Sequence, residues 1–343
     1  MRLGVEAALV GGQIVRGDVA IAEGAVTAAG LASPCGRGIA VPGFVDLQVN
    51  GFAGVDFARA DAEGYRRAGE VLLATGVTSY LPTFITAPEE ELVAALREVP
   101  SATAGARILG AHLEGPFLSS ERLGAHPPAS RRDPDLELLD RLLDAGPIRL
   151  TTLAPELPGA HDLVRALLDR RVTVSFGHSD ATVAEANAGF DLGVHSVTHL
   201  FNAMRPFHHR DPGLAGAALA REDVVIQVIL DGIHLAPETA ALVWRAARGR
   251  MALVTDFTVA PGGRTPEGGL AGSTTPMIEA VRNLHALGAP FEEAVLAATE
   301  IPARIIADPT AGRLEVGLPA DVVVLTDELE IERVLVAGTD RLS

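Results

Sequence analysis

The sequence is poor in cysteine, in clustered positive charge and in long apolar runs, and each absence excludes a class of protein. Cys35 is the only cysteine, so an internal disulfide framework is excluded and a reducing cytosol is expected. The net charge of −16 comes without a run of basic residues, which argues against a nucleic-acid partner. No apolar run approaches the roughly 20 residues that cross a bilayer, and the N-terminus lacks a secretory pattern. We therefore expect a cytoplasmic protein with no membrane contact, and we assign Cys35 no catalytic role.

Apolar residues, by contrast, are plentiful. They make up 48% of the 343 residues, and charged residues make up only 21%, which is typical of a folded chain with a large core. The length exceeds the roughly 250 residues of one (β/α)₈ barrel and leaves material for a small accessory domain. An anionic small molecule remains compatible with the acidic composition, because a pocket has a local charge of its own.

Both chain ends alternate short apolar stretches with glycine-rich turns. Residues 7–10 and 18–22 are followed by Gly11-Gly12 and Glu23-Gly24, and residues 322–325 and 333–338 resemble them. This pattern predicts small antiparallel strands. We expect the two ends to pair into one small β-domain of residues 1–40 and 312–343, with two separate edge ribbons as the alternative.

Residues 41–311 alternate strand and helix patterns about eight times, which is typical of βα units with a parallel sheet. Strands are predicted at 43–49, 77–84, 107–114, 148–155, 171–178, 195–201, 224–231 and 251–257. The predicted helices include 61–74, 88–97, 134–143, 160–170, 182–188 and 237–248. Eight such units favour an α/β fold with a closed (β/α)₈ TIM-type barrel over an open doubly wound sheet.

Polar or ionisable residues follow nearly all of these strands. They are Gln48, Asn50, Glu114, His178, His199, Asp231, His234 and Asp256. Any one of them alone would more often be a hydrogen-bonded structural residue. Their recurrence at the same strand ends indicates a shared site, because that face of a barrel brings distant residues together. Glu114, His178 and His199 supply a carboxylate and two imidazoles, the donors of an open metal site.

Seven motifs, in chain order, carry a family resemblance. They span residues 42–51, 112–117, 177–179, 198–204, 231–234, 254–256 and 270–273. The most specific are Thr198-His-Leu-Phe-Asn-Ala-Met204 and His112-Leu-Glu-Gly-Pro116. With these motifs the sequence resembles the N-acetylglucosamine-6-phosphate deacetylases of the amidohydrolase superfamily over nearly its whole length.

The resemblance implies a metal-dependent enzyme. Glu114, His178 and His199 match the family's metal ligands. Many amidohydrolases carry a His-x-His pair at the first strand end, where this chain has Gln48 and Asn50, so we expect one divalent metal ion rather than two. Three protein ligands leave an open position for water. Zinc is the first expectation for this mixed donor set, with iron(II) or another divalent ion as the alternative.

The resemblance also implies roles for two further residues. Asp256 matches the family's strand-eight aspartate, and one carboxylate beside the water can act as base and then as acid. His234 is expected to donate a hydrogen bond to the acetamide oxygen. A purely structural role for His234 is the alternative.

Substrate contacts follow from the resemblance as well. His126, Asn202 and Ala203 match positions near the sugar or its phosphate, and we add Gln48 and Asn50 to the substrate-binding set. Arg210 resembles an arginine that is supplied to the phosphate site of the neighbouring subunit, which implies a homodimer. A guanidinium suits phosphate because its N–H groups donate in pairs.

The match departs from the family after Asp256. Residues 257–270 are fewer than the family usually has there, and Phe257 stands where a small residue is usual. These departures leave the metal-ligand set unchanged, but they mean that the resemblance does not predict the shape of the substrate pocket. The leading expectation is hydrolysis of N-acetyl-D-glucosamine 6-phosphate to glucosamine 6-phosphate and acetate. The alternatives are a related amidohydrolase that deacetylates another N-acyl sugar, either the galactosamine epimer or an unphosphorylated form, and a non-catalytic scaffold.

Overall fold

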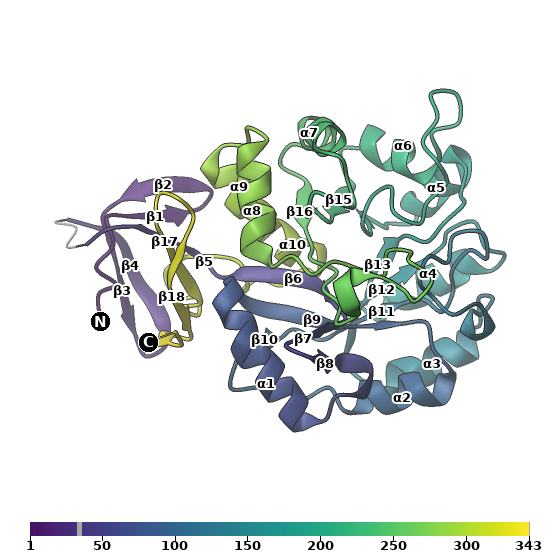
Figure 1. The fold of residues 1–343 in the computed structure, drawn as a ribbon, viewed down its shortest axis with the longest axis horizontal. Coiled ribbons are helices and arrows are strands. Elements are labelled where there is room, and N and C mark those ends of the chain that lie inside the picture. The colour runs from purple at the N-terminus through teal and green to yellow at the C-terminus, as the bar shows by residue number, and fades with distance from the viewer. Residues whose placement is uncertain (33–35, 343) are drawn as a thin grey trace.

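Strands from both chain ends form one sheet at the side of the molecule. The computed structural model describes residues 1–32 and 36–342, so Cys35 lies outside the described residues. The sheet has six strands in the order β19-β18-β17-β5-β1-β2. Their bounds are β1 Ala7–Val10, β2 Gln13–Arg16, β5 Ile39–Pro42, β17 Val322–Leu325, β18 Ile331–Val336 and β19 Thr339–Asp340. Both termini lie in this part of the molecule (Figure 1).

The two ends meet where β17 pairs antiparallel with β5, with Val323 opposite Val41. The prediction of one shared β-domain is therefore confirmed, and the alternative of two separate ribbons is wrong. The expectation of antiparallel strands fails at one ladder, because β1 pairs with β5 in parallel. Between them the chain passes through β2 and the hairpin of β3 (Asp18–Ala22) and β4 (Ala25–Leu31), and then returns in the direction of β1. The division at residues 40 and 312 stays a prediction.

Nine strands form the second large sheet, in which every ladder is parallel. Their bounds are β6 Phe44–Val49, β9 Val77–Ile85, β10 Arg107–Ile108, β11 Ala111–Glu114, β12 Ile148–Leu153, β13 Thr173–Phe176, β14 Ser196–Val197, β15 Val225–Val228 and β16 Met251–Leu253. Because β10 and β11 both pair with β9 and lie in one predicted strand, the nine strands occupy eight positions. The predicted (β/α)₈ barrel is confirmed.

The first and last barrel strands meet through a few contacts instead of a regular ladder. Asn50 donates its backbone N–H to the oxygen of Phe257 at 2.8 Å, and Val49 forms a parallel bridge with Phe257. Deeper in the barrel, the Asp46 carboxylate accepts bonds from the backbone N–H and the hydroxyl of Thr255. One buried carboxylate thus ties β6 to the segment that follows β16.

Helices follow the strands as the pattern predicts. They are α1 Ala62–Leu72, α2 Glu89–Arg97, α3 Leu136–Ala145, α4 Ala160–Asp169, α5 Val183–Phe190, α6 Gly213–Ala220, α7 Pro237–Ala246, α8 Met277–Ala286, α9 Phe291–Ala297 and α10 Glu300–Ile305. The side chains of Asp61 and Asp135 cap α1 and α3, and Thr182 and Glu185 form a capping box on α5. Helices α6, α8, α9 and α10 were not among the predicted helices. The sequence of α6, Gly-Leu-Ala-Gly-Ala-Ala-Leu-Ala, lacks a polar face.

The barrel interior is apolar over part of its length and polar beneath the strand ends. Val45, Leu47, Leu81 and Leu150 belong to an apolar cluster of the interior. A polar layer connects His112, Thr152, Thr198, Ser175 and Gln227 through successive side-chain hydrogen bonds, and all five residues are fully buried. Such a connected network restrains its members, and within the described residues only Oε1 of Gln227 lacks a partner in it.

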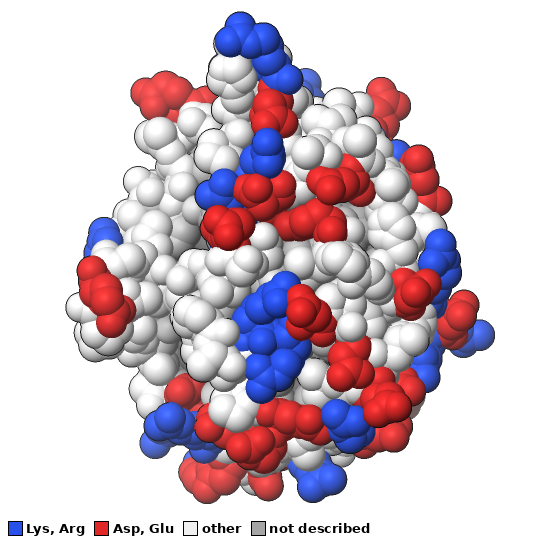
Figure 2. Space-filling model, turned by 90° about the vertical axis from the view of Figure 1, so that its right-hand side faces the viewer, with Lys and Arg blue, Asp and Glu red and all other residues white. Residues whose placement is uncertain are grey.

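Two global features match the composition. Within the described residues, no helix has the length and apolar character that would let it span a membrane. On the face turned to the viewer in Figure 2, acidic and basic side chains lie in small groups among uncharged ones, and no large field of positive charge covers it.

Candidate active site

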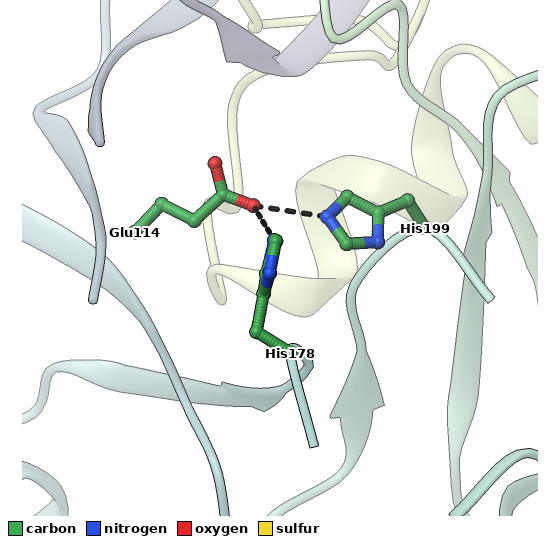
Figure 3. A group of neighbouring side chains, drawn as sticks. All are labelled: Glu114, His178 and His199. Atoms are coloured by element: carbon green, nitrogen blue, oxygen red, sulfur yellow. Dashed lines mark hydrogen bonds and ion pairs between the residues drawn. The ribbon is translucent and has the colours of Figure 1, made fainter. Parts of the chain in front are cut away.

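Three ionisable side chains converge at the carboxyl ends of the barrel strands. Glu114 ends β11, His178 lies two residues beyond β13, and His199 lies two residues beyond β14. Oε1 of Glu114 is 3.2 Å from Nε2 of His178 and 2.9 Å from Nε2 of His199 (Figure 3). All three residues are at most 5% exposed. The predicted ligand set is therefore brought together, with one donor atom from each residue within 4.8 Å of the others.

The local backbone explains how the two histidines turn toward Glu114. His178 and His199 have φ angles of 49° and 29°, in the left-handed region that side chains rarely adopt. Gly177 precedes His178, and a Cβ there would lie 2.9 Å from Cγ2 of Thr152 and 3.0 Å from Cβ of Thr198. Each strand thus ends in a sharp turn that holds an imidazole in an unusual direction, and such strain clusters at functional sites.

The contacts around the cluster fit a divalent metal ion. Nδ1 of His178 lies 2.9 Å from the backbone oxygen of Arg122, so Nδ1 carries the hydrogen and Nε2 keeps its lone pair for a metal. Burial raises the pKa of Glu114, but the three surrounding imidazoles of His126, His178 and His199 outweigh it and hold that pKa well below its usual value. Two imidazole nitrogens and one ionised carboxylate are the donors of an open, catalytic type of site.

Gln48 and Asn50 lie beside the two carboxylates of the site. Nε2 of Gln48 donates to Oε1 of Glu114 at 3.0 Å, and Nδ2 of Asn50 donates to Oδ1 of Asp256 at 2.7 Å. A histidine pair at these positions would supply two further metal ligands, whereas amide N–H groups cannot bind a cation. In this arrangement both amides donate to a carboxylate of the site.

Asp256 follows β16 and has a φ angle of 49°. Burial, followed by the charge of Glu114, raises the pKa of Asp256 to about 8, which favours the protonated acid in the absence of a nearby cation. The preceding residue, Thr255, is held by Asp46, whose own pKa burial raises to about 6. The carboxyl group therefore lies near the three ligands on a fixed backbone, in surroundings that suit a group which gains and loses protons near neutral pH.

Two further histidines present one nitrogen each to the site. Nδ1 of His126 accepts a hydrogen bond from the backbone N–H of Thr86, so its hydrogen is on Nε2, which lies 3.7 Å from Oε2 of Glu114. Burial, followed by the charge of His178, lowers the pKa of His126 to about 4, so the ring is neutral at pH 7. His126 is thus a neutral hydrogen-bond donor at the site.

His234 is positioned by a carboxylate three residues before it. Oδ2 of Asp231 lies 2.8 Å from Nδ1 of His234, and Oδ1 of Asp231 accepts the backbone N–H of His234. Hydrogen bonds from His234 outweigh burial and hold the pKa of Asp231 below its usual range. The two side chains are only 4% and 3% exposed. The Asp231 carboxylate therefore fixes the ring through Nδ1 and leaves Nε2 without a partner among the described residues.

A cavity of about 890 Å³ opens above this cluster. The candidate residues that line it are Asn50, Glu114, His126, His178, His199, Asn202, Ala203, His234 and Asp256. Gln48 is fully buried beneath the cavity and does not line it. Nδ2 of Asn202 donates to the backbone oxygens of His199 and Leu200, which fixes this side chain at the wall.

Arg210 is the one predicted site residue that the structure leaves away from the others. It is exposed, donates from Nη1 to Nε2 of His209, and does not line the cavity of its own chain. Its loop is tied to the barrel by Arg205, whose guanidinium pairs with Asp180 and Asp211.

The shortened segment after Asp256 forms a hairpin at the cavity mouth. Arg264 and Leu270 pair across it, and both line the cavity. The ring of Phe257 packs on Phe52 with centroids 4.5 Å apart and does not line the cavity. The sequence singled out neither Arg264 nor the positioning contacts of Asp46 and Asp231, because only the folded backbone brings these groups to their partners.

Comparisons with known proteins agree on the family. Residues 39–339 match the model of the Amidohydrolase family. N-acetylglucosamine-6-phosphate deacetylase from Rattus norvegicus is 38% identical over 341 residues, which cover 89% of this chain and 83% of that protein. N-acetylgalactosamine-6-phosphate deacetylase from Escherichia coli O157:H7 is 35% identical over 324 residues, which cover 87% of this chain and 86% of that protein.

A solved structure supports the same assignment. It is a variant of N-acetyl-D-glucosamine-6-phosphate deacetylase from Mycobacterium smegmatis in complex with N-acetyl-D-glucosamine-6-phosphate. This structure has a TM-score of 0.91 to the chain at 32% identity, and the match covers 99% of this chain and 98% of that one. The chain therefore belongs to the amidohydrolase family, in its group of N-acetylglucosamine-6-phosphate deacetylases.

Proposed function

We propose that the protein hydrolyses N-acetyl-D-glucosamine 6-phosphate to D-glucosamine 6-phosphate and acetate. The observation that carries this proposal is the convergence of Glu114, His178, His199 and Asp256 in one cavity, in a chain of this family. The N-acetylgalactosamine relative at 35% identity makes the 4-epimer the second candidate substrate. Because the whole ligand set and the candidate acid/base are present, a non-catalytic scaffold is disfavoured.

We assign the metal site to one zinc ion held by Glu114, His178 and His199. A divalent cation there would polarise the acetamide carbonyl and lower the pKa of the attacking water. Iron(II) also binds imidazole and carboxylate ligands and is the alternative ion. The proposal of one ion rests on Gln48, which donates to Glu114 instead of ligating.

Asp256 is assigned to move the proton. Its carboxylate takes one proton from the attacking water, and the same carboxylic acid then gives this proton to the departing amine nitrogen. As the C–N bond breaks, the products are acetate and the free amino sugar. Asn50 donates to Oδ1 of Asp256 and so leaves Oδ2 free to handle the proton.

His234 is assigned to the acetamide oxygen. Held by Asp231, the ring donates from Nε2 toward the oxygen on which negative charge develops. His126 donates from its own Nε2 to the sugar hydroxyls, and Asn202 and Ala203 contribute to the sugar phosphate site. Gln48 and Asn50, first predicted as substrate contacts, are assigned to orient Glu114 and Asp256.

Arg210 is assigned to the phosphate site of a second copy of the chain. Support comes from its exposure and from its position outside the cavity of its own chain. The proposed assembly is therefore a homodimer. The proposed location of the protein is the cytoplasm. Analytical ultracentrifugation measures the assembly directly, and a monomer at the concentration of full activity would exclude a role in trans.

The function is tested by acetate release from three substrates by protein that holds about one equivalent of zinc. These are N-acetylglucosamine 6-phosphate, N-acetylgalactosamine 6-phosphate and unphosphorylated N-acetylglucosamine. The largest kcat/KM is expected for the first. A larger value for the galactosamine sugar would move the assignment to the epimer. If none of the three releases acetate, the non-catalytic scaffold becomes the remaining alternative.

A further inference from the structure

The cavity is acidic, although the proposed substrate carries a phosphate. Asp56, Glu114, Asp256 and Glu267 line it, and the chain has a net charge of −16. The sequence contains no lysine, so arginine is its only side-chain cation apart from protonated histidine. A sugar phosphate that enters such a cavity needs a local positive charge to offset the repulsion between like charges.

Arg264 is the one arginine among the described residues that line the cavity. The only hydrogen bond of its side chain within the described residues runs from Nη1 to the backbone oxygen of Gly268, at 2.8 Å, and no carboxylate there pairs with it. Nε and Nη2 therefore remain free to donate. Arg205, in the neighbouring loop, is by contrast already paired with Asp180 and Asp211.

The hairpin that holds Arg264 is built to keep it in place. Gly268 donates its backbone N–H to the oxygen of Thr265 across a turn that begins Thr265-Pro266, a sequence suited to a β-turn. Thr265 donates to the oxygen of Gly269, and Ala271 donates to the oxygen of Gly263. Arg264 thus lies on a hairpin whose strands are joined on both sides of it.

The base of the hairpin rests on the backbone of the candidate acid/base. Ser273 donates its N–H to the oxygen of Asp256 at 2.9 Å. Gly272, with a φ angle of 129°, approaches so closely that a Cβ there would lie 2.4 Å from the same oxygen. The position of Arg264 is therefore fixed relative to Asp256. A sugar phosphate bound by Arg264 would then have a fixed position relative to the candidate acid/base.

We propose that Arg264 binds the phosphate of the substrate within the same chain and so determines the preference for phosphorylated over unphosphorylated N-acetyl sugars. The inference rests on the proposed function for the identity of the sugar. A guanidinium donates two parallel N–H bonds to a phosphate, a geometry that no other lining side chain among the described residues provides. This cation is additional to Arg210, which does not reach the cavity of its own chain.

Binding of the product sugars tests this inference without relying on turnover. Calorimetry compares glucosamine 6-phosphate with glucosamine on the wild type, Arg264→Gln, Arg264→Lys and Arg245→Gln. Arg245 is an exposed arginine of α7 outside the cavity lining and serves as the matched control. Arg264→Gln is expected to weaken binding of the phosphorylated sugar by about 10- to 100-fold and to leave glucosamine unchanged. Arg264→Lys should recover part of the loss, and Arg245→Gln should match the wild type.

Kinetics give a second readout. In Arg264→Gln, KM for N-acetylglucosamine 6-phosphate should rise by about the same factor, with kcat within about twofold of the wild type. The inference is overturned if Arg264→Gln keeps the wild-type ratio of affinities for the two product sugars, or if the wild type itself does not prefer the phosphorylated one. A wild type that binds glucosamine 6-phosphate through Arg264 but releases no acetate would sink the deacetylase proposal and leave this inference standing.

Discussion

The floor and the rim of the cavity are built in different ways. The floor comprises Glu114, His178, His199 and Asp256, which lie at strand ends and are bonded to neighbours beneath them. The surface segments comprise the hairpin of residues 257–270, which lines the cavity, and the loop of residues 205–211, which does not line the cavity of its own chain. We call both segments the rim, and they are held by turns and partly exposed ion pairs. The floor is thus held by buried contacts, whereas the hairpin of the rim meets it at its base, where Ser273 donates to the backbone oxygen of Asp256.

This difference suggests a division of labour. A residue of the floor acts through chemistry, so its loss should reduce kcat. A rim residue acts on the bound sugar, so its loss should raise KM. The variants below are ordered from the largest expected effect to the smallest. Those of Asp256 and Asp231 test the effect on kcat. Those of Asp46 and Asp211 test how much a contact contributes to the free energy of unfolding.

Asp256→Asn should cause the largest effect. The amide cannot accept and return a proton, so kcat should fall by roughly 10²- to 10⁴-fold while zinc stays bound. Acetate release and metal analysis of the same sample measure both quantities. Turnover at the wild-type level would contradict the proton-transfer role, and loss of zinc would show that Asp256 helps to hold the ion.

Asp231→Asn should lower kcat by about 100-fold, a loss comparable to that of one oxyanion donor, because the ring of His234 loses the carboxylate that orients it. KM should change little. The control is His234→Gln with and without Asp231→Asn: if Asp231 acts only through His234, the double variant is no slower than His234→Gln alone. An additional loss in the double variant would give Asp231 a separate task.

Asp46→Asn tests the closure of the barrel through the pH dependence of stability. Burial raises the pKa of Asp46 from its usual 3.8 to about 6 in the fold. Because the folded value is the higher one, its contribution to stability is complete below about pH 3.8 and is lost as the pH rises through 6.

The stability of the wild type relative to Asp46→Asn should therefore fall between pH 4 and pH 7, by up to roughly 3 kcal/mol for a shift of about two pKa units. Urea denaturation of both proteins across this range measures the difference in the free energy of unfolding. A difference that stays constant, or that grows with pH, would exclude a raised pKa for Asp46.

Asp211→Asn should have the smallest effect. It removes one ion pair of the rim, between Arg205 and a carboxylate whose side chain is 46% exposed. Such pairs contribute less than about 1 kcal/mol to stability. Thermal unfolding should therefore change little, and a large drop in Tm would show that the rim is tied as firmly as the floor.

The same contrast explains what the sequence could predict. Strand ends are visible as apolar runs that stop at a polar residue, so the barrel and the residues of its floor were predicted from the positions of Glu114, His178 and His199. The parallel pairing of β1 with β5 was missed, because alternation in a short strand does not encode the direction of its partner. Helix α6 was missed because its residues are all small or apolar, so it has no amphipathic pattern.

The positioning contacts were beyond the reach of the sequence for a related reason. Asp46 and Thr255 are 209 residues apart, and the bond between them exists only once the first and last barrel strands meet. Arg264 looked like an ordinary loop residue, and its place at the cavity depends on the hairpin turn and on Gly272. Sequence motifs thus identify the residues of the floor, whereas contacts between distant segments decide how those residues are held.

The most direct measurement is a zinc titration of metal-free protein, with acetate release from N-acetylglucosamine 6-phosphate and bound zinc followed together. Because Gln48 donates to Glu114 where a second metal would need a ligand, activity should rise in proportion to bound zinc and reach its maximum at about one equivalent. Glu114→Gln should bind the ion more weakly in the same titration. Activity that needs two equivalents, or full activity without metal, would contradict the single-metal floor.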